Sequence, residues 1–199
     1  MKKFILWIFI LGLIAGGYFA YTKYIDYTQK GSADFVGSSK YFFLSSASNL
    51  DEVTLSLAQD SIISDPEEFL QVASLKKFES AKPGRYRFSK DVSHNQIINQ
   101  LRIGDTEAVK VVVASHRLMS QIAGNITRNL QADSLELLNM MNDPEVAKKY
   151  GFSEDAFRTM FLPNTYQMDW LLTEEEIVKR FAMEYKRFWT EERIAIAKE

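Results

Sequence analysis

The residues best suited to chemistry lie together late in the chain, in the segment Met160–Trp170, which reads Met-Phe-Leu-Pro-Asn-Thr-Tyr-Gln-Met-Asp-Trp. Aromatic rings stack on the faces of sugars, and Asn, Thr, Tyr and Gln side chains hydrogen-bond to hydroxyl and amide groups. A few polar groups in an otherwise apolar cleft fix the orientation of a ligand. The segment therefore favours a carbohydrate groove. Its structural alternative is a turn at Pro163–Asn164 followed by an edge strand.

Other sites of chemistry are not indicated. Asp169 is the only carboxylate within the segment, and on a strand it would share a face with Gln167. The chain has no Gly-rich phosphate loop, no Gly-x-Ser-x-Gly elbow and no His-Glu-x-x-His motif. His94 and His116 lie far apart without a second ligand at metal spacing, so we expect neither a metal nor a cofactor. Glu174–Glu176 is interpreted as a helix start, where acidic side chains offset the macrodipole.

Composition excludes further classes of protein. The chain has no cysteine, so disulfides and thiolate metal sites are ruled out. Its formal net charge of -2 gives no reason to expect a nucleic-acid partner.

The N-terminus predicts a membrane anchor. Lys2 and Lys3 precede a run without charge from Phe4 to Tyr21, and about 20 apolar residues of helix span a bilayer. We expect a cytoplasmic tail at 1–3 and a transmembrane helix at 4–22, because lysines before such a helix favour the cytoplasmic side. A cleaved signal peptide is the alternative, but the apolar run is long and lacks a good cleavage site.

The next part of the chain predicts a linker and a small α+β subdomain. Residues 23–40 contain Gly and Ser clusters that favour a spacer. Tyr41–Leu44 and Arg85–Phe88 are predicted strands, and between them we expect two helices, over Asp51–Gln59 and from the Asp65 cap onward. The order of strand, helix, helix and strand in 41–106 is similar to a LysM module, a peptidoglycan-binding fold. A generic α+β subdomain is the alternative.

The remaining elements are predicted by caps and apolar periodicity. Ser93 with Gln96 and Thr173 with Glu176 form capping-box patterns, and residues 108–114 favour a buried strand. We expect further helices over Leu118–Leu130, from Asp133 and from Asp143. Residues expected to face the core include Val53, Leu55, Leu57 and Leu75, then Leu118, and on the last long helix Ile177, Phe181, Tyr185, Phe188 and Trp189.

These features together resemble the endolytic murein transglycosylase family, also called YceG-like or MltG. Pro163–Tyr166 matches the family's Pro-x-Thr-Tyr element. Arg117–Arg128 resembles the helix after the second strand of the family, and Lys149–Phe152 and Glu184–Trp189 resemble segments of Bacteroidota-type members. The resemblance runs from about Phe42 to the end. It implies an α+β protein in which a LysM-like subdomain at 41–106 precedes the N-terminal part of a mixed α/β catalytic domain at 107–199.

The resemblance also implies a reaction. Such enzymes cut peptidoglycan between N-acetylmuramic acid and N-acetylglucosamine without water, because the 6-hydroxyl of the muramic acid attacks and leaves a 1,6-anhydro end. A carboxylic acid protonates the bridging oxygen and then accepts the proton of the hydroxyl. That acid needs a pKa raised by burial. The scheme is half of the two-carboxylate glycosidase mechanism.

The sequence differs from the family's pattern in two places. The Glu expected before the Pro-x-Thr-Tyr element is Arg158 here, and the Glu often found after it is Gln167. The candidate catalytic residues are therefore Asp169, as the acid, and Gln167, which occupies a position that is often Glu in relatives. The family's Ala-Ser-Ile-Val-Glu block is not found, which suggests a chain shortened at its C-terminus. Beside the catalytic residues, the resemblance implies substrate contacts from Phe161, Pro163, Asn164, Thr165, Tyr166 and Trp170.

The resemblance further implies a location and partners. We expect a single-pass protein of the inner membrane with a periplasmic body. Its expected partners are peptidoglycan glycan strands and the enzymes that synthesise them. Two other functions stay open, a non-catalytic peptidoglycan-binding membrane protein and a scaffold for cell-envelope partners.

Overall fold

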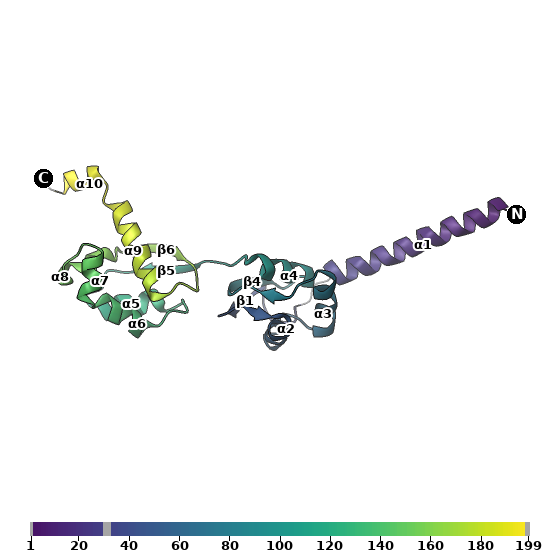
Figure 1. Cartoon of the computed structure of the whole chain (residues 1–199), viewed down its shortest axis with the longest axis horizontal. Helices are drawn as coiled ribbons and strands as arrows, with labels where there is room; N and C mark the ends of the chain where they lie inside the picture. Colours follow the sequence, from purple (N-terminus) through teal and green to yellow (C-terminus); the bar gives the residue numbers. More distant parts are fainter. Residues whose placement is uncertain (1, 30–32, 198–199) are drawn as a thin grey trace. The chain divides into compact units, whose positions relative to one another are not determined.

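Two compact units make up the chain, residues 1–106 and residues 107–199, and each is described by itself. The computed structural model describes residues 2–29 and 33–197, with the backbone alone for residues 2–9, 23 and 26–29. Figure 1 shows the helices and strands of both units, coloured along the sequence. Helices and antiparallel strands occur in both, so the predicted α+β class is confirmed.

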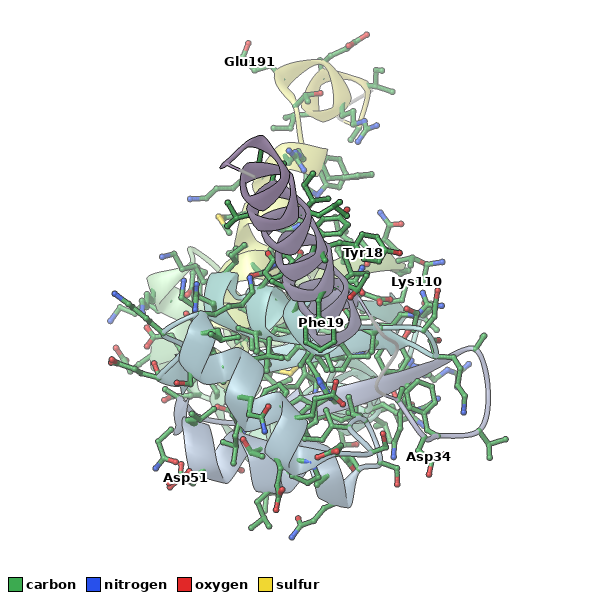
Figure 2. All side chains as sticks on the ribbon, turned by 90° about the vertical axis from the view of Figure 1, so that its right-hand side faces the viewer. Tyr18, Phe19, Asp34, Asp51, Lys110 and Glu191 are labelled. Carbon is green, nitrogen blue, oxygen red and sulfur yellow. The ribbon has the colours of Figure 1, made fainter. Side chains whose placement is uncertain are left out.

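The N-terminal helix α1 (Lys2–Gln29) runs through the predicted span at 4–22. Tyr18 and Phe19 project from it and are exposed, as Figure 2 shows. No helix within the described residues is both long enough and apolar enough to cross a membrane. Residues 4–9 of the predicted span have side chains outside the described ones, so the anchor stays a prediction.

The predicted spacer at 23–40 differs from the observed structure at both ends. Residues 23–29 continue α1, because no glycine or proline stands there to end the helix. At the other end, Phe35 is buried, and its carbonyl accepts a hydrogen bond from the Lys90 ammonium. This segment therefore contributes to the N-terminal core.

The N-terminal unit has the predicted order of strand, two helices and strand. Its strands are β1 (Ser39–Leu44), β2 (Ser48–Asn49), β3 (Ser80–Ala81) and β4 (Gly84–Ser89), and its further helices are α2 (Leu50–Gln59), α3 (Pro66–Leu75) and α4 (His94–Ile103). β1 pairs antiparallel with β4, which places Phe42 opposite Tyr86, and β2 pairs with β3. Likeness to a LysM module remains a prediction.

Caps fix the helices of this unit where the sequence predicted them. The Asp65 side chain accepts from the Glu68 N–H at the start of α3, and Ser93 and Gln96 form a complete capping box at α4. Gly104 ends α4 with a φ of 78°, a left-handed conformation that favours glycine.

The core of the N-terminal unit is aromatic and closely packed. Phe42, Phe69, Tyr86 and Phe88 are each at most 1% exposed, and burying such a side chain contributes roughly 1.5–3 kcal/mol. Two residues that were expected to face this core do not. Leu55 is 62% and Leu75 is 72% exposed, because each lies on the outer face of its helix.

The C-terminal unit builds helices around a two-stranded sheet. Antiparallel β5 (Val109–Val113) and β6 (Asn164–Met168) place Val111 opposite Tyr166. The helices are α5 (Met119–Thr127), α6 (Ser134–Met141), α7 (Pro144–Lys149), α8 (Glu154–Phe157), the 3-10 helix η1 (Arg158–Met160), α9 (Glu174–Phe188) and α10 (Glu191–Ile196). Alternate residues of both strands are buried beneath α9 and α5.

Two expectations for this unit were wrong in detail. Leu118 precedes α5 as its N-cap and is 59% exposed, so it does not join the apolar face of that helix. Phe188, expected on the inner face of α9, is 41% exposed at the end of the helix. The predicted Ile177 and Phe181 are buried, together with Val178 and Ala182. Helix α9 therefore contacts the core mainly through its first half.

Candidate functional site

A cavity of about 540 Å³ lies beside the Pro-Asn-Thr-Tyr element of the C-terminal unit. One wall comes from the start of β6 and the residues before it, and the other comes from the end of α9 and from α10. The first wall comprises Leu162, Pro163, Asn164 and Tyr166, and the second comprises Glu184, Arg187, Phe188 and Arg193. Its volume lies in the range of pockets that hold small-molecule ligands.

Tyr166 joins the two walls. Its ring is buried and meets the Phe181 ring of α9 edge-on, with 4.9 Å between the centroids. Its hydroxyl donates a hydrogen bond of 2.7 Å to the Leu162 carbonyl. Burial raises the pKa of the Tyr166 phenol, and the nearby Glu184 carboxylate raises it further. The hydroxyl therefore stays a neutral hydrogen-bond donor.

Glu184 is the carboxylate in this cavity, and the sequence did not single it out. Its side chain is only 19% exposed. One carboxylate oxygen lies 2.9 Å from the Arg180 guanidinium and 3.7 Å from that of Arg187. These partners lie at helical spacings of four and three residues, where side chains of one helix face meet. The arrangement fixes a negative charge beside the buried Tyr166.

The far end of the cavity is cationic and aromatic. The Arg193 guanidinium lies 4.3 Å from the centre of the Phe188 ring, and its Nη1 donates to the Phe188 carbonyl at 2.9 Å. Arg193 thus covers the end of α9, where carbonyl groups lack helical partners. With Arg187, it gives this wall an excess of positive charge over Glu184.

Three of the predicted substrate contacts line the cavity, namely Pro163, Asn164 and Tyr166. The Asn164 side-chain oxygen accepts from the Thr165 N–H and so shapes the turn into β6. Thr165 points to the exposed outer face of the sheet, opposite Val112. Phe161 is a core residue, 3% exposed and edge-on to Phe157. It supports the wall from behind.

The two predicted catalytic residues lie outside the cavity. Gln167 is exposed on the outer face of the sheet, opposite Lys110, which Figure 2 labels. Asp169 follows the strand in an exposed turn, where its carboxylate accepts from the Leu171 N–H at 2.9 Å. Trp170 is half-buried against the core, and its carbonyl accepts from the Gln131 N–H. None of the three lines the cavity.

Arg158 occupies the position where the family resemblance suggested a catalytic Glu. It begins η1, and its Nη1 donates a 2.8 Å hydrogen bond to the Arg117 carbonyl. This bond ties the loop before α5 to η1. A structural role therefore explains the arginine.

The remaining polar clusters of the sequence have structural roles. Glu176 completes the capping box with Thr173, and hydrogen bonds from the Thr173 backbone and hydroxyl lower its pKa. Glu175 forms an ion pair of 2.9 Å with Lys149. His94 packs edge-on against Phe69, while the His116 ring nitrogen lies 2.8 Å from the Asn125 amide. Within the described part of the chain, no group of His, Asp and Glu side chains is placed to hold a metal.

Comparison with known proteins decides the family. A model described as the YceG-like family matches residues 42–199, which is most of the chain. The chain belongs to the YceG-like family. That match covers the N-terminal unit from residue 42 onward and the whole C-terminal unit, including the cavity residues from Leu162 to Arg193.

Among solved structures, the YceG-like chain is similar to a yceG-like protein of Listeria monocytogenes. The two sequences are 18% identical, and the TM-score is 0.40. The match covers 81% of this chain and 59% of the Listeria protein, so the chain spans less than two thirds of that relative. Among curated proteins, none matches the chain.

Proposed function

We propose that this YceG-like chain is a membrane-anchored lytic transglycosylase. It would cleave nascent peptidoglycan strands between N-acetylmuramic acid and N-acetylglucosamine and leave 1,6-anhydro ends. The observation that carries the proposal is the cavity in which Pro163, Asn164 and Tyr166 face Glu184. Family membership supports it, because lytic transglycosylase activity is generally associated with YceG-like proteins.

The proposed chemistry needs one carboxyl group beside the glycan. The 6-hydroxyl oxygen bonds to the anomeric carbon, the bond to the bridging oxygen breaks, and one proton moves from the hydroxyl to the departing oxygen. Because water is not consumed, a single carboxyl group can carry both proton transfers.

Glu184 is better placed for this role than Asp169. A carboxyl group that contacts the glycan has to line the cavity, and Asp169 lies outside it in an exposed turn. Glu184 lines the cavity with its side chain 19% exposed. We therefore propose Glu184 as the carboxylate that contacts the glycan, and we retain Asp169 as the competing candidate from the sequence.

The cavity walls suggest how a sugar would be oriented. The apolar surfaces of Pro163 and Phe188 fit a sugar face, whereas the Asn164 amide can hydrogen-bond to an acetamido group. Arg187 and Arg193 fit the lactyl or peptide carboxylate of the muramic acid. Gln167 lies across the sheet from these groups, so we propose no catalytic step for it.

Anchoring in the inner membrane is part of the proposal. Ile14, Tyr18 and Phe19 are exposed on α1. Exposed apolar surface on this scale is unusual for a soluble monomer, and it therefore supports the proposed anchoring. Lys2 and Lys3 precede this helix and favour a cytoplasmic N-terminus and a periplasmic body. Such an anchor would hold the chain near newly made glycan strands and the enzymes that synthesise them.

The experiment is digestion of purified sacculi by the full chain in detergent, with mass spectrometry of the released muropeptides. The wild-type chain should yield 1,6-anhydro products. Removing a carboxyl group that transfers protons should lower the rate by about 100-fold or more, so Glu184→Gln should lose the products whereas Asp169→Asn should keep them. The matched control is Glu145→Gln, which removes an ion-paired but exposed helix glutamate.

Two results would decide against parts of the proposal. Loss of products in Asp169→Asn with retention in Glu184→Gln would move the acid to the exposed turn. Absence of anhydro products from the wild-type chain, in a reaction where a known lytic transglycosylase digests the same sacculi, would reject the enzymatic function.

A non-catalytic peptidoglycan-binding protein is the second candidate. Arg158 and Gln167 stand where carboxylates were expected, and Glu184 is engaged by two arginines. This candidate predicts that the chain sediments with intact sacculi and yields no anhydro products. Charge reversal at Arg187, which lines the cavity, should then weaken sedimentation, whereas the same change at the exposed Lys148 should not.

A further inference from the structure

A groove of about 330 Å³ runs along one edge of β5 in the C-terminal unit, and the proposed glycan chemistry does not use it. Three consecutive strand residues, Lys110–Val112, line it together with residues 125–129 at the end of α5, Thr127 excepted. Consecutive side chains of a strand point to opposite faces of a sheet, so a groove that touches all three follows the edge of the strand. Among its described lining residues none belongs to β6, so this is the edge that faces away from β6.

The main chain along this edge has no hydrogen-bonding partner. β5 pairs with β6 alone, in a two-stranded sheet. Within the described part of the chain, the N–H and C=O groups of residues 109–113 form no hydrogen bond outside that pairing. In an antiparallel pair only alternate residues direct these groups toward the partner strand. The others form an open row, which is a template for pairing with another extended chain.

The walls of the β5 groove carry positive charge and no negative charge. Lys110 and Arg128 are accessible cations of the lining, and neither forms an ion pair with another residue that the structure describes. None of the described lining residues is an Asp or a Glu. Accessible charges of one sign select a partner of the opposite sign. Val111 and Ile126 are at most 2% exposed and add apolar contact.

We propose that the β5 groove docks an extended, acidic segment of a protein partner. The main chain of the segment would add a strand beside β5, and its carboxylates would meet Lys110 and Arg128. In this binding mode main-chain hydrogen bonds supply affinity and side-chain contacts supply specificity. The amide side chains of Asn125 and Asn129 in the lining can bond to further polar groups of the segment. Because β5 has five residues, the docked segment has about the same length.

The test uses the full chain in an uncharged polyoxyethylene detergent. The probe is a peptide of alternating glutamate and valine, about as long as β5, with an acetylated amino end and an amidated carboxyl end. Calorimetry gives the affinity, and NMR spectroscopy follows hydrogen exchange at each backbone amide. The peptide should bind and slow exchange at alternate residues of 109–113, namely those whose N–H points away from β6.

Backbone-modified peptides separate strand addition from simple charge attraction. Methylating the nitrogen of every second residue removes the N–H groups along one side of an extended peptide. Only one side of the peptide can face β5. One of the two alternate methylation patterns should therefore weaken binding by about tenfold or more, and the other should leave it nearly unchanged.

Variants test the charges of the groove. Lys110→Glu and Arg128→Glu should each weaken binding of the glutamate peptide by about three- to tenfold, as expected for accessible ion pairs. Both should improve binding of the matched peptide in which lysine replaces glutamate. Lys186→Glu, an exposed change on α9 in the same unit, should change neither affinity. Circular dichroism checks that the variants are folded.

Four outcomes would overturn the proposal. Exchange in β5 stays unchanged when the peptide is added, or both methylation patterns weaken binding equally, or charge reversal at Lys110 and Arg128 has no more effect than at Lys186. In the fourth, the chain alone forms a dimer with slow exchange in β5 that the peptide does not disperse, which would assign the edge to a second copy. Because these measurements use no peptidoglycan, their failure is distinguishable from failure of the proposed transglycosylase activity.

Discussion

Tyr166 is the residue that makes the cavity wall part of the core. Replacing it with Phe removes the hydroxyl that donates to the Leu162 carbonyl but keeps the buried ring. We expect Tyr166→Phe to lower the free energy of unfolding by about 1 kcal/mol, the net value of one hydrogen bond. Urea denaturation measures this change. Tyr150→Phe is the control, with an expected change below about 0.5 kcal/mol; equal losses in both variants would contradict the argument.

The Tyr166 phenol should also titrate late. Burial raises its pKa first, and the charge of Glu184 adds to the effect. A phenol whose pKa is raised in the folded state contributes stability below its unfolded pKa of about 10, and this contribution disappears as the pH rises through the folded pKa. Ultraviolet titration should show one late tyrosine that is missing in Tyr166→Phe. Glu184→Gln should bring it earlier without abolishing the delay; no change in Glu184→Gln would place the carboxylate away from the phenol.

At this scale, the sequence predicted one wall of the cavity and missed the other. Pro163, Asn164 and Tyr166 were recognisable because turn and aromatic signals coincide within four positions. Glu184 was not recognisable in this way. Helical periodicity identifies which face of α9 is buried, but it does not show that the segment around Pro163 lies opposite Glu184. Its arginine neighbours at three and four residues were a usable signal.

The capping box at the start of α9 is the element-scale feature with the clearest consequence. Thr173→Ala removes the hydroxyl that accepts from the Glu176 N–H and should destabilise the C-terminal unit by about 1 kcal/mol. Thermal unfolding followed by circular dichroism measures it. Thr173→Ser keeps the hydroxyl and should retain most of the stability, and a similar loss in both variants would rule out the cap as the cause.

This cap should weaken in acid. Hydrogen bonds from Thr173 lower the pKa of Glu176, so the charged carboxylate is favoured in the folded state. Stability from a lowered pKa is present above the unfolded value of about 4.3 and is lost as the pH falls through the folded value. The difference between wild type and Thr173→Ala should therefore shrink below about pH 4. A difference that grows in acid would contradict this sign.

Elements with a cap and a long apolar period were predictable, and short ones were not. Asp65, Ser93 and Thr173 each begin a helix as the sequence indicated. By contrast, α8 and α10 have four and six residues, too few to show a helical period. The exposed Leu118 shows a related limit. It continues the four-residue spacing of the apolar residues in α5, but it is the N-cap residue and therefore does not lie on the apolar face of the helix.

Each unit of the molecule has its own apolar core. One core is built from residues between Phe42 and Leu101, and the other from residues between Val109 and Ala182. Between them, residues 105–108 have no regular secondary structure. A unit with its own core can in principle unfold by itself. Truncating a buried side chain in one core should therefore destabilise mainly the unit that contains it.

Truncation of one aromatic side chain in each core tests this division. Phe69 and Phe181 are both fully buried, and Phe→Ala in a core costs about 3–5 kcal/mol. Hydrogen exchange with mass spectrometry should show that Phe69→Ala releases protection in α3, α4 and β4 but not in β5 or α9. Phe181→Ala should do the reverse, and the exposed Leu55→Ala and Met183→Ala should change neither. Loss of protection in both units from either core variant would mean that the two cores unfold together.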